Sequence, residues 1–149
     1  MRAVVQRAKE GKVTVNENTV SSIGPGLVVL LGVDRDDEPG DMDYMVNKIT
    51  GLRIFPDENG KLNRSVADIN GEILLVSQFT LLGDARNGRR PGFTQAARPE
   101  QADAMYLQIA ERIRDMGIPL KTGQFQTEME VHLINDGPVT ILLDSHKTF

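Results

Sequence analysis

The stretch SQFTL, residues 77–81, places polar side chains where an apolar run would otherwise continue, because EILLV precedes it and another leucine follows. An unpartnered buried polar group costs about 1–3 kcal/mol. Ser77, Gln78 and Thr80 are therefore expected either to line a site or to pair with neighbouring backbone. Thr80 has the only obvious nucleophilic hydroxyl here, but no His or Lys stands beside it to activate it. A covalent mechanism through Thr80 stays open as an alternative.

A second unusual stretch is LINDGPVTILLD, residues 133–144. Its Asn, Asp and Gly residues predict a corner between two strands, Glu128–Ile134 and Val139–Leu143. Pro138 is unexpected there, because proline removes a backbone donor just where strand pairing should begin. Gly137 and Pro138 therefore either make a plain corner or hold backbone atoms in a geometry that a ligand uses.

The sequence EMEVH places Glu128, Glu130 and His132 on one face of a predicted strand. These side chains could form a metal site or an acid–base cluster. A solvated strand face is the favoured alternative, because any half-exposed strand shows this spacing. The chain has no cysteine, so it has no thiolate ligand or Cys nucleophile. It also lacks the glycine-rich, metalloprotease and serine-hydrolase motifs.

A basic segment occupies GDARNGRRPGFTQAARPE, residues 83–100, although the formal net charge of the chain is −4. Bulk charge therefore argues against broad affinity for nucleic acids, and a polyanion would have to be met by a local patch. Arg86, Arg89, Arg90 and Arg98 are the candidates for such a patch. A solvated loop is the alternative, because Gly and Pro are frequent in this segment.

Hydrophobic periodicity predicts the elements that carry these residues. Lys9–Lys12 would turn an opening antiparallel hairpin, and the apolar runs 27–33 and 72–82 read as buried strands. A helix follows Asp41 as a possible cap, and a second runs over Pro99–Met116, stopped by Gly117. The residues predicted to face the core from the two helices are Met42, Met45, Val46, Ile49 and Leu52, then Ala102, Met105, Tyr106, Ile109, Ile113 and Met116.

These elements predict an α+β fold in which mixed and antiparallel sheets curl into a barrel-like core with two main helices. A length of 149 residues suits a single domain over residues 1–149, and 40% hydrophobic with 26% charged residues is ordinary for a globular chain. Asn59-Gly60 predicts a further hairpin turn. No signal peptide or membrane-spanning run is visible, so a cytoplasmic location without membrane contact is expected.

SQFTL, NDGPVT and the opening MRAVVQRAKEGKVTV together resemble the D-aminoacyl-tRNA deacylases, small enzymes that remove D-amino acids from mischarged tRNA. The resemblance covers essentially the whole chain, with both motifs in the expected order. It implies a homodimer whose two active sites lie at the subunit interface. Ser77, Gln78, Phe79 and Thr80 would then be catalytic-pocket residues that receive the terminal adenosine and the aminoacyl ester of aminoacyl-tRNA.

The resemblance also implies that Gly137 and Pro138 form a Gly-cisPro element, which reaches into the partner subunit's pocket and excludes L-amino acids. Glycyl-tRNA, which has no side chain to clash, is expected to pass this filter. Catalysis is attributed to the 2′-hydroxyl of the substrate and to backbone groups, with no metal and no organic cofactor. The Arg residues of segment 83–100 would hold tRNA phosphates. The alternative hypothesis is a non-catalytic module that binds nucleic acid or a nucleotide.

Overall fold

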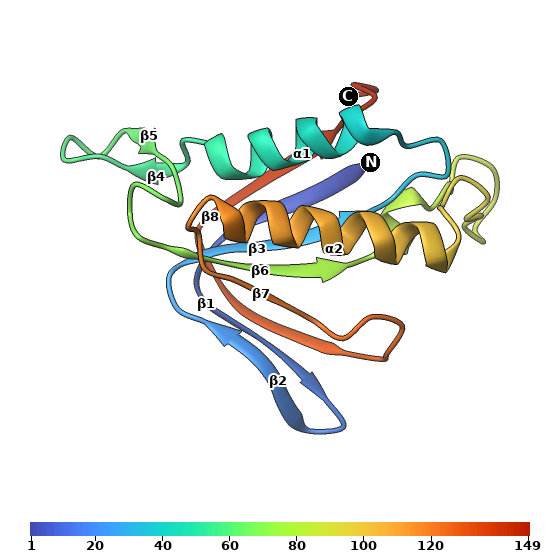
Figure 1. Ribbon diagram of the computed structural model, residues 1–149, viewed down its shortest axis with the longest axis horizontal. Coiled ribbons are helices and arrows are strands. Elements are labelled where there is room, and N and C mark those ends of the chain that lie inside the picture. The colour runs from blue at the N-terminus through green and yellow to red at the C-terminus, as the bar shows by residue number, and fades with distance from the viewer.

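Figure 1 shows the computed structural model, which describes residues 1–149 as two helices lying on one side of a curved mixed sheet. The sheet order is β2-β1-β3-β6-β7, and β8 pairs with β1 as well. Strands β3, β6 and β7 run parallel to one another, whereas β1, β2 and β8 make antiparallel pairs. The strands are β1 (Arg2–Val15), β2 (Asn18–Ile23), β3 (Gly26–Gly32), β4 (Phe55–Pro56), β5 (Leu62–Arg64), β6 (Glu72–Ser77), β7 (Leu120–Thr122) and β8 (Glu130–Asp144).

The sheet curls almost into a barrel because β1 is long enough to pair with different strands along its two halves. Its first half, Arg2–Ala8, pairs with β3, and its second half, Gly11–Val15, pairs with β2. The curl brings β2 to the opposite edge, where the Ser21 hydroxyl donates a hydrogen bond of 2.7 Å to the Thr122 carbonyl of β7. The predicted α+β architecture, with a barrel-like sheet and two main helices, is confirmed.

The hairpin predicted at Lys9–Lys12 is wrong, because β1 runs through these residues without a turn. Gly11 serves close packing instead: a Cβ atom there would lie 2.7 Å from the Val28 side chain. The chain actually reverses between β1 and β2 at Asn16 and Glu17, whose φ angles are positive. Lys9 is the extra residue of a bulge against β8. Polar composition alone therefore did not separate a bulged strand from a turn.

The two predicted helices are present as α1 (Pro39–Gly51) and α2 (Pro99–Asp115). Helix α1 begins earlier than expected: Glu38 is its N-cap, and the Asp41 side chain accepts a 2.8 Å hydrogen bond from the Glu38 backbone N–H. Asp41 thus caps the first turn from inside the helix. The predicted apolar faces are buried or half-buried except at Met116, which is 54% exposed beyond the end of α2.

Two apolar clusters fill the molecule. The larger one, of 25 buried residues, lies between the helices and the sheet. The smaller one, of six, lies within the curl of the strands and includes Val28, Leu74 and Val76. The predicted turn at Asn59-Gly60 is confirmed between β4 and β5, with Gly60 at φ +77°. Neither helix is long and apolar enough to cross a bilayer.

Candidate active site

Strand β6 ends at Ser77, five residues before the predicted end of the strand. The short 3-10 helix η1 (Phe79–Leu82) follows it, because Gln78 makes the last backbone bond to β3 and its carbonyl then accepts the Leu81 N–H. The first N–H groups of a helix have no partner within the helix. Those of Phe79 and Thr80 have none elsewhere in the chain. The turn therefore presents two free backbone donors beside the end of a buried strand.

A cavity of about 540 Å³ opens at this point. Three segments line it: the end of β6 with η1, the chain that leads into α2, and the chain that leads into β8. Nine of its 14 lining residues are hydrophobic. Its volume lies within the range of small-ligand pockets, roughly 300–1,000 Å³. The lining residues are Val76, Ser77, Gln78, Phe79, Phe93, Ala96, Ala97, Pro99, Ala102, Phe125, Gln126, Thr127, Met129 and Val131.

Two aromatic rings lie together in the lining of this cavity. The ring centroids of Phe79 and Phe93 are 5.3 Å apart at an interplanar angle of 68°, an edge-to-face pair. Phe79 is 55% exposed, which is unusual for a phenylalanine held by a partner ring. An exposed ring beside an apolar cavity offers a surface on which a flat base can stack.

Thr80 lies outside the cavity lining, although sequence motif SQFTL groups it with the residues that form the wall. Its hydroxyl oxygen accepts a hydrogen bond of 2.5 Å from the Gln78 side-chain amide. An amide N–H donates a proton and cannot remove one, so Gln78 does not activate this hydroxyl as a nucleophile. No His or Lys side chain bonds to it. The geometry gives Thr80 no base of the kind that covalent hydrolases use.

The corner predicted at residues 135–138 is not a hairpin. Strand β8 continues through it and pairs with β1 on both sides, at Asn135 with Ala8 and at Thr140 with Gln6. Five steps along β8 thus match two along β1, so the intervening residues form a bulge. Gly137 and Pro138 are exposed in this bulge, and the peptide bond between them is cis.

Buried Arg7 supports the bulge from the side of β1. Its Nε donates to the Asp136 carbonyl at 3.1 Å and lies 3.4 Å from the Asp136 carboxylate, while Nη1 donates to the Ile54 carbonyl at 2.8 Å. Gly137 has φ +118°, and a Cβ atom there would lie 2.7 Å from Arg7 Nη2. Arg7 was not among the site residues predicted from the sequence. Its one local signal is a charged residue between buried positions of an apolar strand.

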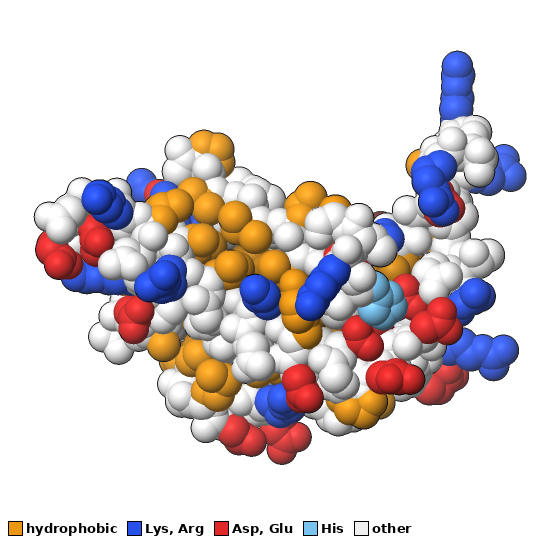
Figure 2. All heavy atoms as spheres, turned by 90° about the horizontal axis from the view of Figure 1, so that it is seen from above, with side chains coloured by type: hydrophobic (Ala, Val, Ile, Leu, Met, Phe, Trp, Pro, Cys, Tyr) orange, Lys and Arg blue, Asp and Glu red, His pale blue; other side chains and the backbone are white.

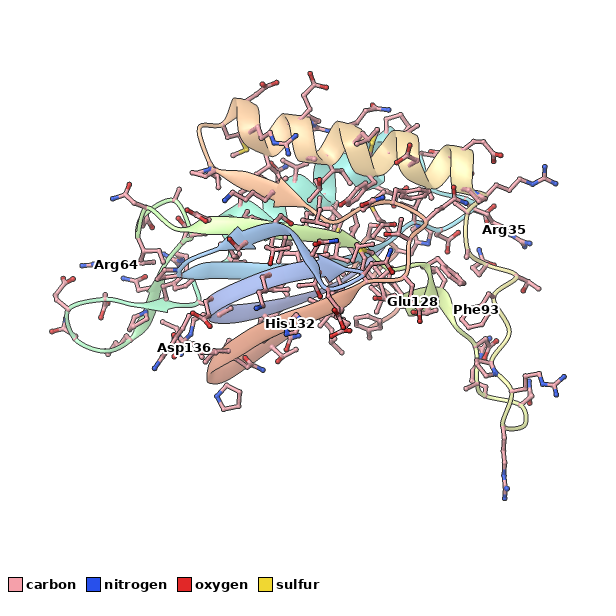
Figure 3. All side chains as sticks on the ribbon, turned by 90° about the horizontal axis from the view of Figure 1, so that it is seen from below. Arg35, Arg64, Phe93, Glu128, His132 and Asp136 are labelled. Atoms are coloured by element: carbon pink, nitrogen blue, oxygen red, sulfur yellow. The ribbon has the colours of Figure 1, made fainter.

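The pocket and the bulge lie at opposite ends of the same stretch of β1. Arg2 donates a 3.1 Å hydrogen bond to the Leu81 carbonyl of η1, whereas Arg7 holds the bulge. Five residues of extended strand separate these arginines by about 17 Å. Figure 3 shows the same separation, with Phe93 and Asp136 towards opposite ends of the molecule. One chain therefore does not bring SQFTL and Gly137-Pro138 to one site.

Segment 83–100 carries its arginines in two settings. Backbone bonds between Asp84 and Gly92 close a loop that stands off one end of the molecule, with its basic side chains outermost (Figure 2). Within it, Arg86 donates three hydrogen bonds to the Asp84 carboxylate, two from its guanidinium group and one from its backbone N–H, and these hold the pKa of that carboxyl well below its usual range. Arg89 and Arg90 are exposed and pair with no acid.

Arg98 lies outside this loop, as the exposed N-cap residue of α2, where Pro99 and Ala102 of the same helix line the cavity. The structure therefore divides the four predicted arginines into one already paired within the loop, two free at its end, and one beside the cavity. Only the last three are free to meet a phosphate.

The alternating Glu128, Glu130 and His132 do not form a compact ligand set. The side chains of Glu130 and His132 are 75% and 44% exposed and lie 3.6 Å apart, and Glu128 precedes the strand. The His132 ring instead lies 3.3 Å from the Thr14 hydroxyl. This arrangement matches the solvated face that the sequence analysis favoured.

A denser charged cluster, which the sequence did not suggest, joins the two ends of the chain. The buried Asp37 carboxylate pairs with the Met1 ammonium group at 2.7 Å, and His146 Nε2 lies 3.1 Å from the same carboxylate. Burial raises the pKa of Asp37, against the opposing effect of the ammonium group. Asp34 lies on the other side of the His146 ring. Each carboxylate already has partners within the chain, which indicates a structural role.

A half-open barrel with a largely apolar cavity, an exposed aromatic ring and free backbone donors defines a small α+β protein with a pocket of small-ligand size. The chain belongs to the D-Tyr-tRNA(Tyr) deacylase family, whose model matches residues 4–144. It is 60% identical over its whole length to a D-aminoacyl-tRNA deacylase of Clostridioides difficile, and all of that protein is covered. It is 58% identical to a protein of the same name from Symbiobacterium thermophilum, of which 99% is covered.

Solved structures share the fold. A protein named c-Myc DNA Unwinding Element Binding Protein superposes with a TM-score of 0.92 at 45% identity, over 97% of this chain and 98% of that one. A probable eukaryotic D-amino acid tRNA deacylase superposes with a TM-score of 0.77 at 20% identity, over 95% and 97%. The second likeness concerns the fold alone.

Proposed function

We propose that this chain hydrolyses the ester bond of D-aminoacyl-tRNA and releases a free D-amino acid and tRNA. Membership of the deacylase family is the observation that carries this proposal. The site is compatible with it, since free backbone donors of η1 lie beside the cavity and no activated side-chain nucleophile is present. The activity requires neither a metal nor an organic cofactor in this proposal.

The cavity would receive the terminal adenosine of the tRNA. Its apolar walls suit the base, and the exposed Phe79 ring, held edge-on by Phe93, offers a stacking surface. Ser77 and Gln78 place polar groups at the end of β6 among these apolar walls. They would hydrogen-bond to the sugar or to the ester, which orients the aminoacyl group towards η1.

The free N–H groups of Phe79 and Thr80 would then stabilise the reaction. Attack on the ester carbonyl carbon places negative charge on the carbonyl oxygen, and rigid backbone donors stabilise such charge without reorganising. The C–O bond to the ribose breaks, the ribose oxygen takes a proton, and water supplies the hydroxyl of the released acid. In this scheme the 2′-hydroxyl of the substrate assists the attack of water on the ester. Thr80 helps to position the ester and forms no covalent bond with it.

The chirality filter would come from a second copy of the chain. Within one subunit the Gly137-Pro138 bulge and the SQFTL pocket are far apart, and in this proposal a homodimer joins them. An enzyme that accepts many side chains but rejects one enantiomer has to contact groups that all amino acids share. Backbone atoms of a bulge held by Arg7 suit this task. Glycine carries no side chain to clash, so glycyl-tRNA should also react.

The remaining features follow from the substrate. Arg89, Arg90 and Arg98 would contact phosphates of the acceptor arm, with Arg86 kept in the loop by Asp84. We place the protein in the cytoplasm, where charged tRNA is used, and treat residues 1–149 as one deacylase domain. Both points are part of the proposal.

The direct test is hydrolysis of D-tyrosyl-tRNA and L-tyrosyl-tRNA by the purified protein, with glycyl-tRNA as a third substrate. The proposal expects rapid release of D-tyrosine, measurable release of glycine, and L-tyrosyl-tRNA that survives as in buffer. Equal hydrolysis of both enantiomers would reject the filter. No hydrolysis of either one would reject the enzyme.

One comparison favours a second candidate function. The name of the structural neighbour at 45% identity describes a DNA-binding protein. A non-catalytic nucleic-acid-binding role would rest on the same basic loop. It predicts salt-dependent binding of duplex DNA at least as tight as that of uncharged tRNA, without ester hydrolysis. The formal net charge of −4 argues against it.

A further inference from the structure

One wall of the cavity is the chain segment that leads into α2. This segment is held by hydrogen bonds to the acidic turn that follows β3, residues 34–36. Asp34 and Ala96 form an isolated antiparallel bridge, and Ala97 N–H donates to the Val33 carbonyl at 2.9 Å. The Arg35 N–H likewise donates to the Gln95 carbonyl at 2.9 Å. Ala96 and Ala97 line the cavity, so the position of this wall depends on how the two segments are joined.

The Gln95 side chain makes the junction. Its Nε2 donates to Asp34 Oδ1 at 2.9 Å and to Asp36 Oδ2 at 3.0 Å, which uses both of its N–H groups. Asp34 is buried and already accepts the Asp36 backbone N–H. Two carboxylates beside each other repel, and a donor between them offsets that repulsion. Gln95 itself does not line the cavity.

We infer that Gln95 is a positioning residue for this site. Its two hydrogen bonds to Asp34 and Asp36, which we call the clip, hold the Phe93–Pro99 wall against the acidic turn and so set the shape of the cavity that binds the substrate. This inference rests on the proposed function for its substrate. Its sequence position, two residues after Phe93, gives no hint of the role, because glutamine in a loop is ordinarily solvated. The clip acts on binding, since none of its atoms reaches the reacting groups.

The test compares two substitutions of Gln95 with one control substitution of Gln101. Gln95→Met keeps the length and removes both N–H groups, whereas Gln95→Lys supplies a cationic donor to the same two carboxylates. Gln95→Met should raise KM for D-tyrosyl-tRNA about tenfold with kcat nearly unchanged, and Gln95→Lys should restore KM. The matched control is Gln101→Met, since Gln101 contacts the same turn through the Arg35 carbonyl without joining the carboxylates, and it should leave KM unchanged.

A pH profile gives a readout that a purely structural role would not move. Gln95→Glu places a third carboxylate beside Asp34 and Asp36, and only its protonated form can donate. Its KM excess over the wild type should therefore shrink as the pH falls from about 8 to about 5, because neighbouring carboxylates raise the pKa of a carboxyl group. The other charged groups at this turn are Arg35, with Nε 3.9 Å from Asp36, and His146, with Nδ1 3.9 Å from Asp34; both are the same in the two proteins, so their effect cancels in the KM excess. A KM excess that does not change with pH would contradict the clip.

Amide exchange separates this inference from the proposed function. Exchange of the Ala97 N–H should accelerate in Gln95→Met and return to the wild-type rate in Gln95→Lys, whether or not the protein hydrolyses any ester. An inactive wild type would reject the function alone. Unchanged KM and Ala97 exchange in Gln95→Met, or no rescue by Gln95→Lys, would show that Gln95 has no positioning role.

Discussion

Gly137 stands against the buried guanidinium group of Arg7, with φ +118° and no room for a Cβ atom. Arg7 in turn fixes the carbonyl of Asp136, the residue just before it. These contacts make the backbone of the bulge a rigid surface. In the proposed mechanism this surface, and not a side chain, distinguishes D- from L-aminoacyl esters.

Gly137→Ala should disturb that surface. The added methyl group must displace Arg7 and hold an L-residue at a positive φ, which costs on the order of 1–3 kcal/mol. We expect the ratio of D- to L-tyrosyl-tRNA hydrolysis to fall at least about tenfold. Gly88→Ala is the control: its φ is +80°, but nothing lies within 4 Å of the added atom. An unchanged ratio in folded Gly137→Ala protein would remove the bulge from the mechanism.

Thr80→Val tests the absence of a covalent step. The substitution removes a hydroxyl that accepts a bond from Gln78 but contacts no base. Deacylation of D-tyrosyl-tRNA should therefore continue at a rate within about tenfold of the wild type, which corresponds to one lost hydrogen bond. Single-turnover kinetics with labelled tyrosine provide the measurement. A trapped acyl-enzyme at residue 80 in the wild type, or complete loss of rate with normal tRNA binding, would reverse the assignment.

At the scale of elements, the local hydrophobic pattern predicted the helices and strands whose formation depends on their own residues. Apolar periodicity located both helices and the core strand 27–33, since each buries one face regardless of its partners. It did not locate the bulges. Lys9–Lys12 and Asn135–Pro138 carry residues that suit turns, but β1 and β8 pair through both places as continuous strands. Pairing over such distances is invisible in either segment alone.

For the candidate site, the sequence predicted the two motifs but not the residues that support them. SQFTL and Gly137-Pro138 stand out because polar and proline residues interrupt apolar runs. Arg7 and Gln95 do not stand out, because their roles come from residues distant in the chain: Ile54 and Asp136 for Arg7, and Asp34 for Gln95. Supporting residues of this kind follow from tertiary structure, not from spacing.

The loop between η1 and α2 should act through charge. Arg89→Ala combined with Arg90→Ala removes two unpaired cations, so the slope of log binding constant against log salt for tRNA should shrink by about 1–2 units. The loss should be similar for tRNAs of different sequence. Filter binding at several salt concentrations measures it. Arg112→Ala, which breaks an ion pair with Asp43 between the helices, is the control. An unchanged slope would show that Arg89 and Arg90 belong to a solvated loop that does not contact tRNA phosphates.

Tyr106 of α2 ties the second helix to the strand that carries the site. Its hydroxyl donates to the Leu75 carbonyl at 2.6 Å, and burial raises its pKa from the ordinary tyrosine value of about 10 to about 12. Because the folded pKa is the higher one, the stability it contributes is fully present below pH 10 and is lost as the pH rises towards 12.

The free energy of unfolding should therefore fall by on the order of 2 kcal/mol between pH 10 and pH 12 through this group. Urea titrations of the wild type and of Tyr106→Phe over this range give the measurement. The variant should be less stable at neutral pH, because it lacks the hydrogen bond, yet lose less stability between pH 10 and pH 12. Parallel losses in the two proteins would contradict the assignment.

At the scale of the whole molecule, the SQFTL pocket and the Gly137-Pro138 bulge lie too far apart to meet within one chain. Exposed apolar residues such as Leu142 and Phe79 are compatible with a surface that a second copy covers. We therefore expect a dimer by sedimentation at micromolar concentration. A fully active monomer would mean that the bulge does not take part.

Subunit mixing tests this arrangement most directly. Ala96→Trp should fill the cavity and abolish hydrolysis, and Gly137→Ala should lose the preference for the D-enantiomer. When the two variants are co-expressed, about half of the dimers pair one subunit of each kind, and each such dimer holds one intact pocket facing one intact bulge. Mixed dimers isolated through a different affinity tag on each subunit should hydrolyse D-tyrosyl-tRNA with the wild-type D-to-L ratio, at about half of the wild-type site count per dimer. Mixed dimers that show the lowered ratio of the Gly137→Ala protein would contradict a site shared between subunits.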